Sequence, residues 1–233
     1  MIEQMNTVPP KDIWVVIAAW NEGSVIAGVV SLVTAKSLNV VVVDDGSPDD
    51  TAEQAEMAGA HVLRHPINLG QGAALKTGID YAVSQGAEYV VTFDADGQHS
   101  EDEIIPVVET LRLSQADVAL GSRFIGQAIS IPWTRVVTLK AAIWFTYFTT
   151  GLKLSDAHNG FRALTKDFAS KLEIHQNRMA HASEIVAFIA KNKSRYIEVP
   201  VTIKYTEYSL RKGQKLSNSI RILFELALRK LVR

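Results

Sequence analysis

The chain has 233 residues, a net charge of −1 and no cysteine, with 47% hydrophobic and 21% charged residues. This is ordinary globular usage for one sizeable α/β domain with a short appendage, and the lack of cysteine excludes disulfides and thiolate metal sites and agrees with a reducing compartment. Neither a signal peptide nor an apolar stretch of the ~20 residues that span a membrane is found, so we expect a cytoplasmic protein.

The first half of the chain alternates short β-branched runs with helical patterns. Helical periodicity and good helix formers are found at 24–36, 51–58 and 73–84. Such alternation predicts a mostly parallel sheet covered by helices on both faces. In sheets of this kind ligands bind at the carboxyl ends of the strands, so the residues after each strand are the candidates for a site. The strands are predicted at 13–19, 40–44, 61–63, 89–94 and 118–121.

The second half has a looser pattern. Ser100 and Glu103 form a capping-box pattern at the start of a helix. The last helix begins at residue 217, which divides the chain into a main domain of residues 1–216 and a C-terminal helix of residues 217–233. The elements predicted between them are a helix at 133–150, a loop at 155–160, a helix at 183–191 and a strand at 196–201.

Acidic residues follow the predicted strand at 89–94. Alternation along an extended chain puts the carboxylates of Asp94 and Asp96 on the same side. Two hard oxygen ligands can hold Mg²⁺ or Mn²⁺, which neutralises a diphosphate leaving group, and Gln98 can add a third oxygen. The alternative is a polar turn in which these residues serve the backbone. The position at the end of a buried strand favours the metal.

Polar and aromatic residues also follow the strands at 40–44 and 13–19. An aspartate at Asp44 or Asp45 can accept a hydrogen bond from a nucleobase, and the alternative is a helix N-cap. We expect one of the two to serve each purpose. Trp20 can stack on the base and Glu22 can bond the ribose or base, whereas the alternative for Trp20 is a side chain folded over the end of the sheet.

Two further segments are less specific. Gly70 and Gly72 lead into a helix and allow close approach of a ligand, but Leu75 stands where the third glycine of a dinucleotide fingerprint should be. Tight packing between helix and sheet is the favoured interpretation. Arg123 follows the strand at 118–121, where a guanidinium can hold donor phosphates or serve the structure.

These segments, together and in this order, resemble glycosyltransferase family 2, which has the GT-A fold. The most similar branch is the dolichyl-phosphate (polyprenyl-phosphate) mannose or glucose synthases, and the similarity covers residues 11–215. The last matching segment resembles the one that this branch places near the acceptor phosphate. The matching segments are 17–22, 43–49, 65–72, 94–99, 121–123 and 156–162.

The resemblance implies a role for each matching position. For the acceptor it implies Asp156 and Arg162 as catalytic residues, with Arg211 and Lys215 as contacts from a loop. For the metal it implies Asp94, Asp96 and Gln98. The residues implied to contact the donor are Ala18, Trp20, Glu22, Val43, Asp45, Asp94, Ala95 and Arg123.

The implied reaction is an inverting transfer from a GDP- or UDP-sugar to a polyprenyl phosphate, dependent on Mg²⁺ or Mn²⁺. Because a phosphate oxygen is already anionic, Asp156 would orient the acceptor rather than deprotonate it. The alternative acceptor is a glycan hydroxyl in polysaccharide assembly, which needs a base, with Asp156 or Glu184 as candidates. Two rivals from other classes are a sugar nucleotidyltransferase, whose glycine-rich loop is absent from 18–22, and a non-catalytic protein that binds nucleotide sugars.

Residues 211–233 contain seven basic residues and one acid, which leaves a net charge of −7 on residues 1–210. A basic amphipathic helix predicts peripheral attachment to an anionic membrane surface, and the alternative is a terminal helix packed on the core. A nucleic-acid-binding protein is more often basic over a whole face, so no nucleic-acid partner is expected, and a homo-oligomer is left open. The apolar stripe of this helix is Ile220, Leu223, Phe224, Ala227, Leu228 and Leu231.

Overall fold

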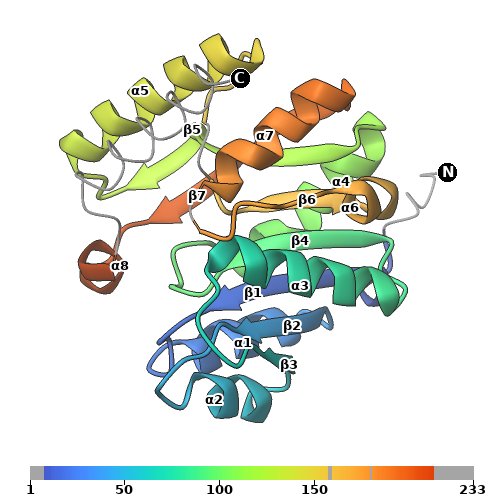
Figure 1. Ribbon diagram of the computed structural model, residues 1–233, viewed down its shortest axis with the longest axis vertical. Coiled ribbons are helices and arrows are strands. Elements are labelled where there is room, and N and C mark those ends of the chain that lie inside the picture. Colours follow the sequence, from blue (N-terminus) through green and yellow to red (C-terminus); the bar gives the residue numbers. More distant parts are fainter. Residues whose placement is uncertain (1–7, 157–158, 179, 213–233) are drawn as a thin grey trace, which may run out of the picture.

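Seven strands form one sheet in the order β3-β2-β1-β4-β6-β5-β7, in a computed structural model that describes residues 8–156, 159–178 and 180–212 (Figure 1). The strands are parallel except β6, which runs antiparallel to β4 and β5. They are β1 (Ile13–Ala19), β2 (Asn39–Asp44), β3 (His61–Arg64), β4 (Tyr89–Asp94), β5 (Val118–Ile129), β6 (Arg162–Thr165) and β7 (Tyr196–Lys204).

Helices cover both faces of the sheet, as the sequence predicts (Figure 1). One face carries α1 (Ile26–Thr34), α2 (Thr51–Met57) and α4 (Ile104–Ser114). The other carries α3 (Gln71–Ser84), α6 (Lys166–Lys171) and α7 (His181–Asn192). The remaining helices are α5 (Trp133–Thr150), α8 (Glu207–Lys212) and the 3-10 turns η1 (Pro10–Asp12) and η2 (Glu101–Glu103).

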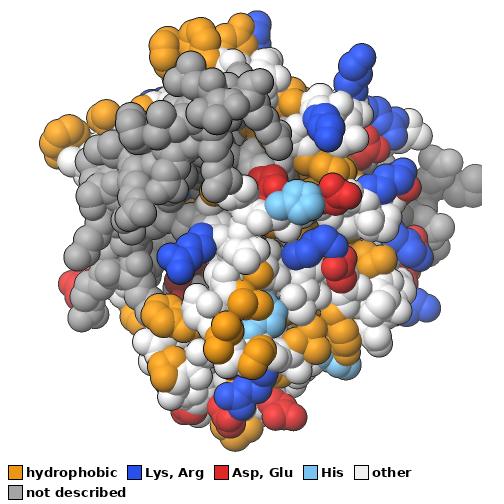
Figure 2. All heavy atoms as spheres, viewed as in Figure 1, with side chains coloured by type: hydrophobic (Ala, Val, Ile, Leu, Met, Phe, Trp, Pro, Cys, Tyr) orange, Lys and Arg blue, Asp and Glu red, His pale blue; other side chains and the backbone are white. Residues whose placement is uncertain are grey.

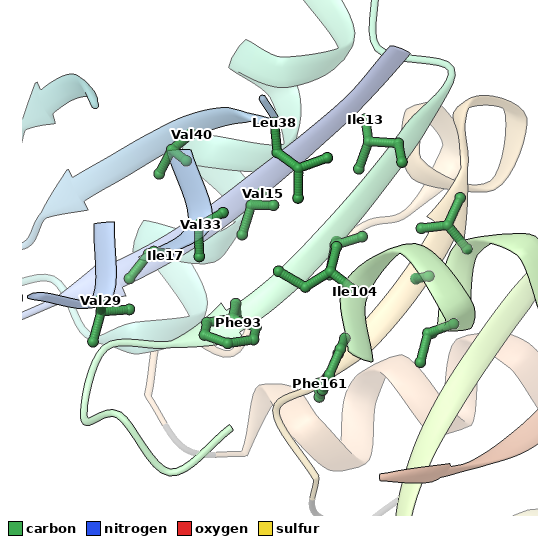
Figure 3. Packing of buried hydrophobic residues seen from close by; sticks show 14 of the residues in the cluster. Ile13, Val15, Ile17, Val29, Val33, Leu38, Val40, Phe93, Ile104 and Phe161 are labelled. Atoms are coloured by element: carbon green, nitrogen blue, oxygen red, sulfur yellow. The ribbon is translucent and has the colours of Figure 1, made fainter. Parts of the chain in front are cut away.

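Strand β1 lies in the middle of both cores. Ile13, Val15 and Ile17 belong to the cluster that includes α1 and α4 (Figure 3), and Trp14 and Val16 belong to the cluster on the opposite face. Each buried Val or Ile contributes about 1.5–3 kcal/mol. Because both faces of β1 are covered, its sequence is a continuous apolar run rather than an alternating one.

Helix α3 packs closely on the sheet because of Gly78. A Cβ atom at this position would lie 2.4 Å from Val16 Cγ1 and 3.1 Å from Val43 Cγ2. Contacts this short force the helix or the strands to move. Gly78 therefore sets how closely α3 approaches β1 and β2, whose carboxyl ends carry the candidate site.

The strands and helices of the first half lie where the sequence predicts them, but β6 and α6 were not predicted. Strand β6 has four residues, which are too few to establish a period of two. Helix α6 has one local signal: the Thr165 side chain accepts a hydrogen bond from the N–H of Phe168 at 3.3 Å. Strand β5 is also longer than predicted, because after a register shift between Ser122 and Gln127 it pairs with β7 again as far as Ile129.

The predicted capping box at Ser100 is wrong. Ser100 precedes η2 without capping it through its side chain. The Glu103 carboxylate instead accepts two hydrogen bonds from the backbone N–H of Thr202 in β7, at 2.9 and 3.0 Å. The Glu103 carboxylate therefore binds a distant strand, whereas the local pattern predicts that it binds the start of the helix. The predicted C-terminal helix at 217–233 and its boundary at 216 lie outside the described residues.

Candidate active site

The candidate site lies where the strand order reverses. Strand β1 has β2 on one side and β4 on the other, and the chain runs from β1 to β3 in one direction before it returns to β4. Ala18 of β1 is in register with Val43 of β2 and with Asp94 of β4. Ligands of open α/β sheets bind at such a reversal, outside the carboxyl ends of the strands. The structure thus places two predicted donor residues beside the first predicted metal ligand.

The two carboxylates after β4 are in different electrostatic environments. The pKa of Asp96 is raised to about 6, chiefly by burial and also by the charges of Asp94 and Glu22, against the opposing effect of a backbone hydrogen bond from Gln98. Burial also raises the pKa of Asp94, but the hydrogen bond and charge of His99 and the charge of Arg162 outweigh it, so this pKa lies below its usual value. Ionisation of Asp96 next to an ionised Asp94 is therefore unfavourable in the metal-free protein.

A divalent cation fits these residues. Mg²⁺ is commonly bound by one or two carboxylates, with the remaining ligands from water and substrate phosphates. Within the described ranges no three or more His, Cys, Asp or Glu side chains come together as a complete metal cluster. The Asp94 and Asp96 pair thus matches a site that a diphosphate completes. Gln98 is buried in the same turn, and its carbonyl accepts a hydrogen bond from Lys204 N–H at 2.9 Å.

Two residues that the sequence did not single out shape the acidic turn. His99 Nε2 lies 2.9 Å from Asp94 Oδ2, and its ring is buried against Phe93 and Phe161. Gly160 lies against the same carboxylate, because a Cβ there would be 2.3 Å from Asp94 Oδ1. A side chain at residue 160 would displace Asp94, so glycine is required where the 155–160 loop meets β4.

Arg162, the first residue of β6, is a buried charged residue near this turn. Arg162 is in register with Thr92 of β4 and Leu120 of β5. Burial lowers the pKa of Arg162 to about 10, with the charges of Asp94 and Asp156 opposing the shift. Its Nη1 has no hydrogen-bond partner within the described part of the chain. Arg162 is therefore a cation whose charge interacts with the carboxylates of Asp94 and Asp156. Its Nη1 group can still donate a hydrogen bond to a ligand.

Asp156 and Arg123, predicted for the acceptor and the donor, form one ion pair. Arg123 Nε donates to Asp156 Oδ2 at 2.6 Å, and Arg123 Nη1 donates to the Tyr205 hydroxyl oxygen at 2.6 Å. Both side chains are buried, and Asp156 Oδ1 has no hydrogen-bond partner among the residues that the structure describes. Arg123 thus orients Asp156, and its contact with donor phosphates stays a prediction.

The loop after β1 is held by the loop after β2. Three successive backbone N–H groups donate to side chains: Asn21 to Ser47 Oγ at 2.8 Å, Glu22 to Thr51 Oγ1 at 2.8 Å and Gly23 to Asp49 Oδ2 at 3.1 Å. This fixes the backbone that carries the side chains of Trp20 and Glu22. Trp20 is 51% exposed, which disagrees with the alternative of a side chain buried over the end of the sheet.

The expected division of roles between Asp44 and Asp45 is wrong in one respect. Neither residue caps α2, because Asp49 accepts the N–H of Thr51 at 3.2 Å. Asp49 is closer in sequence to the helix and reaches its first turn directly. Asp44 is buried and accepts the N–H of Ser47 at 3.1 Å.

Asp45 anchors the segment 65–70. It accepts the backbone N–H groups of Leu69 at 2.9 Å and Gly70 at 2.6 Å, and its Oδ1 lies 2.7 Å from His65 Nδ1. The nucleobase contact of Asp45 stays a prediction, and a carboxylate with about four lone-pair sites has capacity for it. These three partners make Asp45 a structural residue of the loop in any case.

The two glycines at the start of α3 approach another segment rather than the sheet. Cβ atoms at Gly70 and Gly72 would lie 2.3 Å from Asn177 O and 2.1 Å from Gln176 O, and the N–H of Gly72 donates to Asn177 O at 2.8 Å. The predicted role in packing between helix and sheet belongs to Gly78 instead. Glu184, the alternative base, accepts the N–H groups of His175 and Gln176 and so holds this segment in place.

The last predicted site residues follow β7. Arg211 lies in α8, but its side chain and all of Lys215 are outside the described part of the chain. Ala95 is buried next to the acidic pair. The structure therefore brings together, at the carboxyl ends of β1, β2 and β4, the acidic turn, Arg162 and the predicted donor residues Ala18 and Val43. The Arg123 and Asp156 pair adjoins them through the charge of Asp156 on Arg162.

Comparisons with known proteins agree with this geometry. Residues 14–173 match glycosyl transferase family 2. The chain is 30% identical to a UDP-N-acetylglucosamine–dolichyl-phosphate N-acetylglucosaminyltransferase of Methanococcus voltae, over 95% of this chain and 97% of that one. It is 29% identical to a polyprenol monophosphomannose synthase of Mycolicibacterium smegmatis, over 94% and 87% of the two chains.

A solved structure has the same fold. It is glucosyl-3-phosphoglycerate synthase from Mycobacterium tuberculosis in complex with Mn²⁺ and UDP-glucose, with a TM-score of 0.68 and 18% identity over 92% of this chain and 76% of that one. This likeness bears out the expected GT-A architecture.

Replacing Asp96 with Asn should stabilise the metal-free protein at neutral pH. The pKa of Asp96 is about 6 in the folded state and 3.8 as a model value, so its charge destabilises the fold increasingly as the pH rises from about 4 to about 6 and fully above that. At 1.4 kcal/mol per pKa unit the gain in Asp96→Asn is about 3 kcal/mol at pH 7.5 and absent at pH 4. Urea unfolding in EDTA at both pH values measures it. An equal stability difference at pH 4 and pH 7.5 contradicts the electrostatic cause.

Proposed function

Because the chain belongs to glycosyl transferase family 2, we propose that it transfers a sugar, with inversion, from a GDP- or UDP-sugar to a polyprenyl phosphate. The proposal is carried by one observation: Asp94, the first residue of the acidic pair, is in register with Ala18, which is in turn in register with Val43. A nucleoside at Ala18 and Val43 directs its diphosphate towards the acidic pair. Relatives named for dolichyl-phosphate and polyprenol substrates support the acceptor.

Asp94 and Asp96, with Gln98, would hold Mg²⁺ or Mn²⁺. When bound, the cation neutralises the charge that develops on the leaving diphosphate. The structural relative bound to Mn²⁺ supports this cofactor. The raised pKa of Asp96 supports it independently, because a cation stabilises the ionised carboxylate against the poor solvation and the repulsion by Asp94 that raise this pKa.

On the acceptor side, Arg162 and Asp156 do different work. An acceptor phosphate oxygen forms the new bond to the anomeric carbon as the bond to the diphosphate oxygen breaks. Arg162 attracts the acceptor phosphate through the guanidinium donor that has no partner within the described residues. Asp156, fixed by Arg123, orients the acceptor and does not need to remove a proton from it.

A glycan hydroxyl is the second candidate acceptor. Such an acceptor must lose a proton, and Asp156 Oδ1, which has no hydrogen-bond partner within the described ranges, can accept it. Glu184 is the weaker candidate for this base, because its carboxylate accepts two backbone N–H groups. The two acceptor classes differ in their pH dependence, since the hydroxyl alone requires an ionised base.

The transfer test uses a panel of GDP- and UDP-sugars with Mn²⁺ or Mg²⁺ and a short polyprenyl phosphate. We expect transfer from one donor, its loss with EDTA, and a loss of at least 100-fold in Asp96→Ala because a metal carboxylate is removed from the transition state. The matched control is Asp80→Ala, an exposed aspartate on α3 paired with Lys76. Full activity in EDTA, or equal activity of the two variants, argues against the metal; transfer to a glycan alone argues against the lipid acceptor.

We also propose that the protein works at a membrane surface, with α5 as a contact. None of the described helices is long and apolar enough to cross a membrane. Helix α5 nevertheless exposes aromatic and apolar side chains to solvent, carries Arg135 and Lys140, and has no acidic residue. Apolar side chains stand out over both ends of α5 in Figure 2. The exposed residues of α5 are Trp133, Val137, Trp144, Tyr147 and Phe148.

The position of α5 relates this face to the acceptor side. The Arg135 guanidinium carbon lies 5.3 Å from the centre of the Tyr205 ring, and the Tyr205 hydroxyl binds Arg123, the partner of Asp156. Trp and Tyr side chains favour the membrane interface, and each basic residue near anionic lipid contributes about 1 kcal/mol. A lipid beside α5 therefore has its phosphate near Asp156. The predicted C-terminal helix, outside the described residues, would add to this attachment.

Co-sedimentation with phosphatidylglycerol vesicles at low salt tests the membrane contact. The double variant Trp144→Ser/Phe148→Ser should bind at least tenfold more weakly than the wild type, since each buried aromatic contributes about 1.5 kcal/mol or more. The control is Leu32→Ser/Met57→Ser, which removes two exposed apolar side chains from α1 and α2. Equal losses in both double variants, or none in either, would exclude α5 as the contact.

A further inference from the structure

Contacts connect the end of β7, the last strand, to the turn that carries Asp94 and Asp96, and connect the helix after β7 to the loop after β1. Lys204 N–H at the end of β7 donates to Gln98 O at 2.9 Å, and Ile203 forms an antiparallel bridge with His99. The end of β7 is thus fixed to the turn that carries the acidic pair. Whatever follows β7 begins beside this turn.

The start of α8 is locked in place by reciprocal hydrogen bonds. Thr206 N–H donates to Ser209 Oγ at 3.0 Å, and Ser209 N–H donates to Thr206 Oγ1 at 3.1 Å. The Ser209 side chain is buried, and so is Tyr205 before it. These contacts hold the backbone around Tyr208 in one conformation.

Tyr208 connects this helix to the loop after β1. Its hydroxyl donates to Glu22 Oε2 at 2.5 Å, across 186 positions of sequence. Glu22 is itself fixed by the hydrogen bond from its N–H to Thr51 Oγ1. The contact therefore joins two rigid backbones from opposite sides of the acidic turn, and both partners are half-buried.

We propose that Tyr208 is a positioning residue of the donor site, which holds the Glu22 carboxylate ready for the nucleoside. The inference rests on the proposed function and on the role predicted for Glu22 from the sequence, a hydrogen bond to the ribose or base. A glutamate that is already held loses less rotamer freedom when the ligand binds. Tyr208 and Arg211 both lie in α8. The same helix would therefore contribute Tyr208 to the donor site and, as the sequence predicts, Arg211 to the acceptor site.

A double-mutant cycle on nucleoside diphosphate binding tests this role. Calorimetry with UDP and with GDP, in Mn²⁺, identifies the nucleotide that the wild type binds, and this nucleotide is then used for every variant. Tyr208→Phe should weaken binding three- to tenfold. Glu22→Ala should weaken it as much or more, and Tyr208→Phe should have no further effect in the Glu22→Ala background, because Tyr208 acts through Glu22.

Kinetics and a control variant separate this role from general destabilisation. Tyr208→Phe should raise the donor KM while kcat at saturating donor changes less than twofold. The control, Tyr196→Phe, removes a hydroxyl from the other end of β7 and should bind nucleotide as the wild type does. Wild-type affinity in Tyr208→Phe, or additive losses in the double variant, overturns the inference alone. A wild type that binds neither UDP nor GDP overturns the proposed function as well.

Discussion

Two partly buried carboxylates at the end of β4, whose charges are poorly solvated and repel each other, organise the candidate site. Asp94 and Asp96 follow a strand whose other residues lie in the core, so their charges are poorly solvated, and the pKa of Asp96 rises to about 6. The surrounding chain stabilises the charge of Asp94 more than that of Asp96, through the hydrogen bond from His99 and the charge of Arg162, whereas Asp96 accepts one backbone hydrogen bond from Gln98. The remaining negative charge is relieved when a cation binds, and a diphosphate brings further oxygen ligands to that cation.

Segments distant in sequence hold this arrangement. Gly160 lets its loop reach Asp94, and the ion pair of Arg123 and Asp156 fixes the middle of β5 to the same loop. The end of β7 pairs with the turn at Gln98. In the proposed function, these contacts would keep a donor surface over β1 and β2 and an acceptor surface over β5 and β6 on either side of the acidic pair.

The sequence predicts the sheet and the acidic pair because both depend on local patterns. Strands β1 and β4 are buried on both faces, which leaves continuous apolar runs, and the acidic residues come at the end of such a run. The expected extended alternation is wrong, because β4 ends at Asp94 and Asp96 lies in the turn that follows. Strand β6 was missed because it has four residues and exists through its pairing with β4 and β5. The Ser100 and Glu103 pattern gave a wrong prediction of a capping box, because the Glu103 carboxylate accepts a hydrogen bond from the N–H of Thr202 instead. Tyr208 has no local signal, since its partner is 186 positions away.

The central claim is that the acidic pair and a nucleoside diphosphate bind a divalent cation together. Titration of Mn²⁺, followed by electron paramagnetic resonance, with and without the nucleoside diphosphate that the protein binds, tests it most directly. In the wild type the nucleotide should tighten Mn²⁺ binding at least tenfold beyond its own affinity for the ion, and Asp96→Asn should remove that gain. Equal Mn²⁺ affinity with and without the nucleotide, or an undiminished gain in Asp96→Asn, would contradict the account.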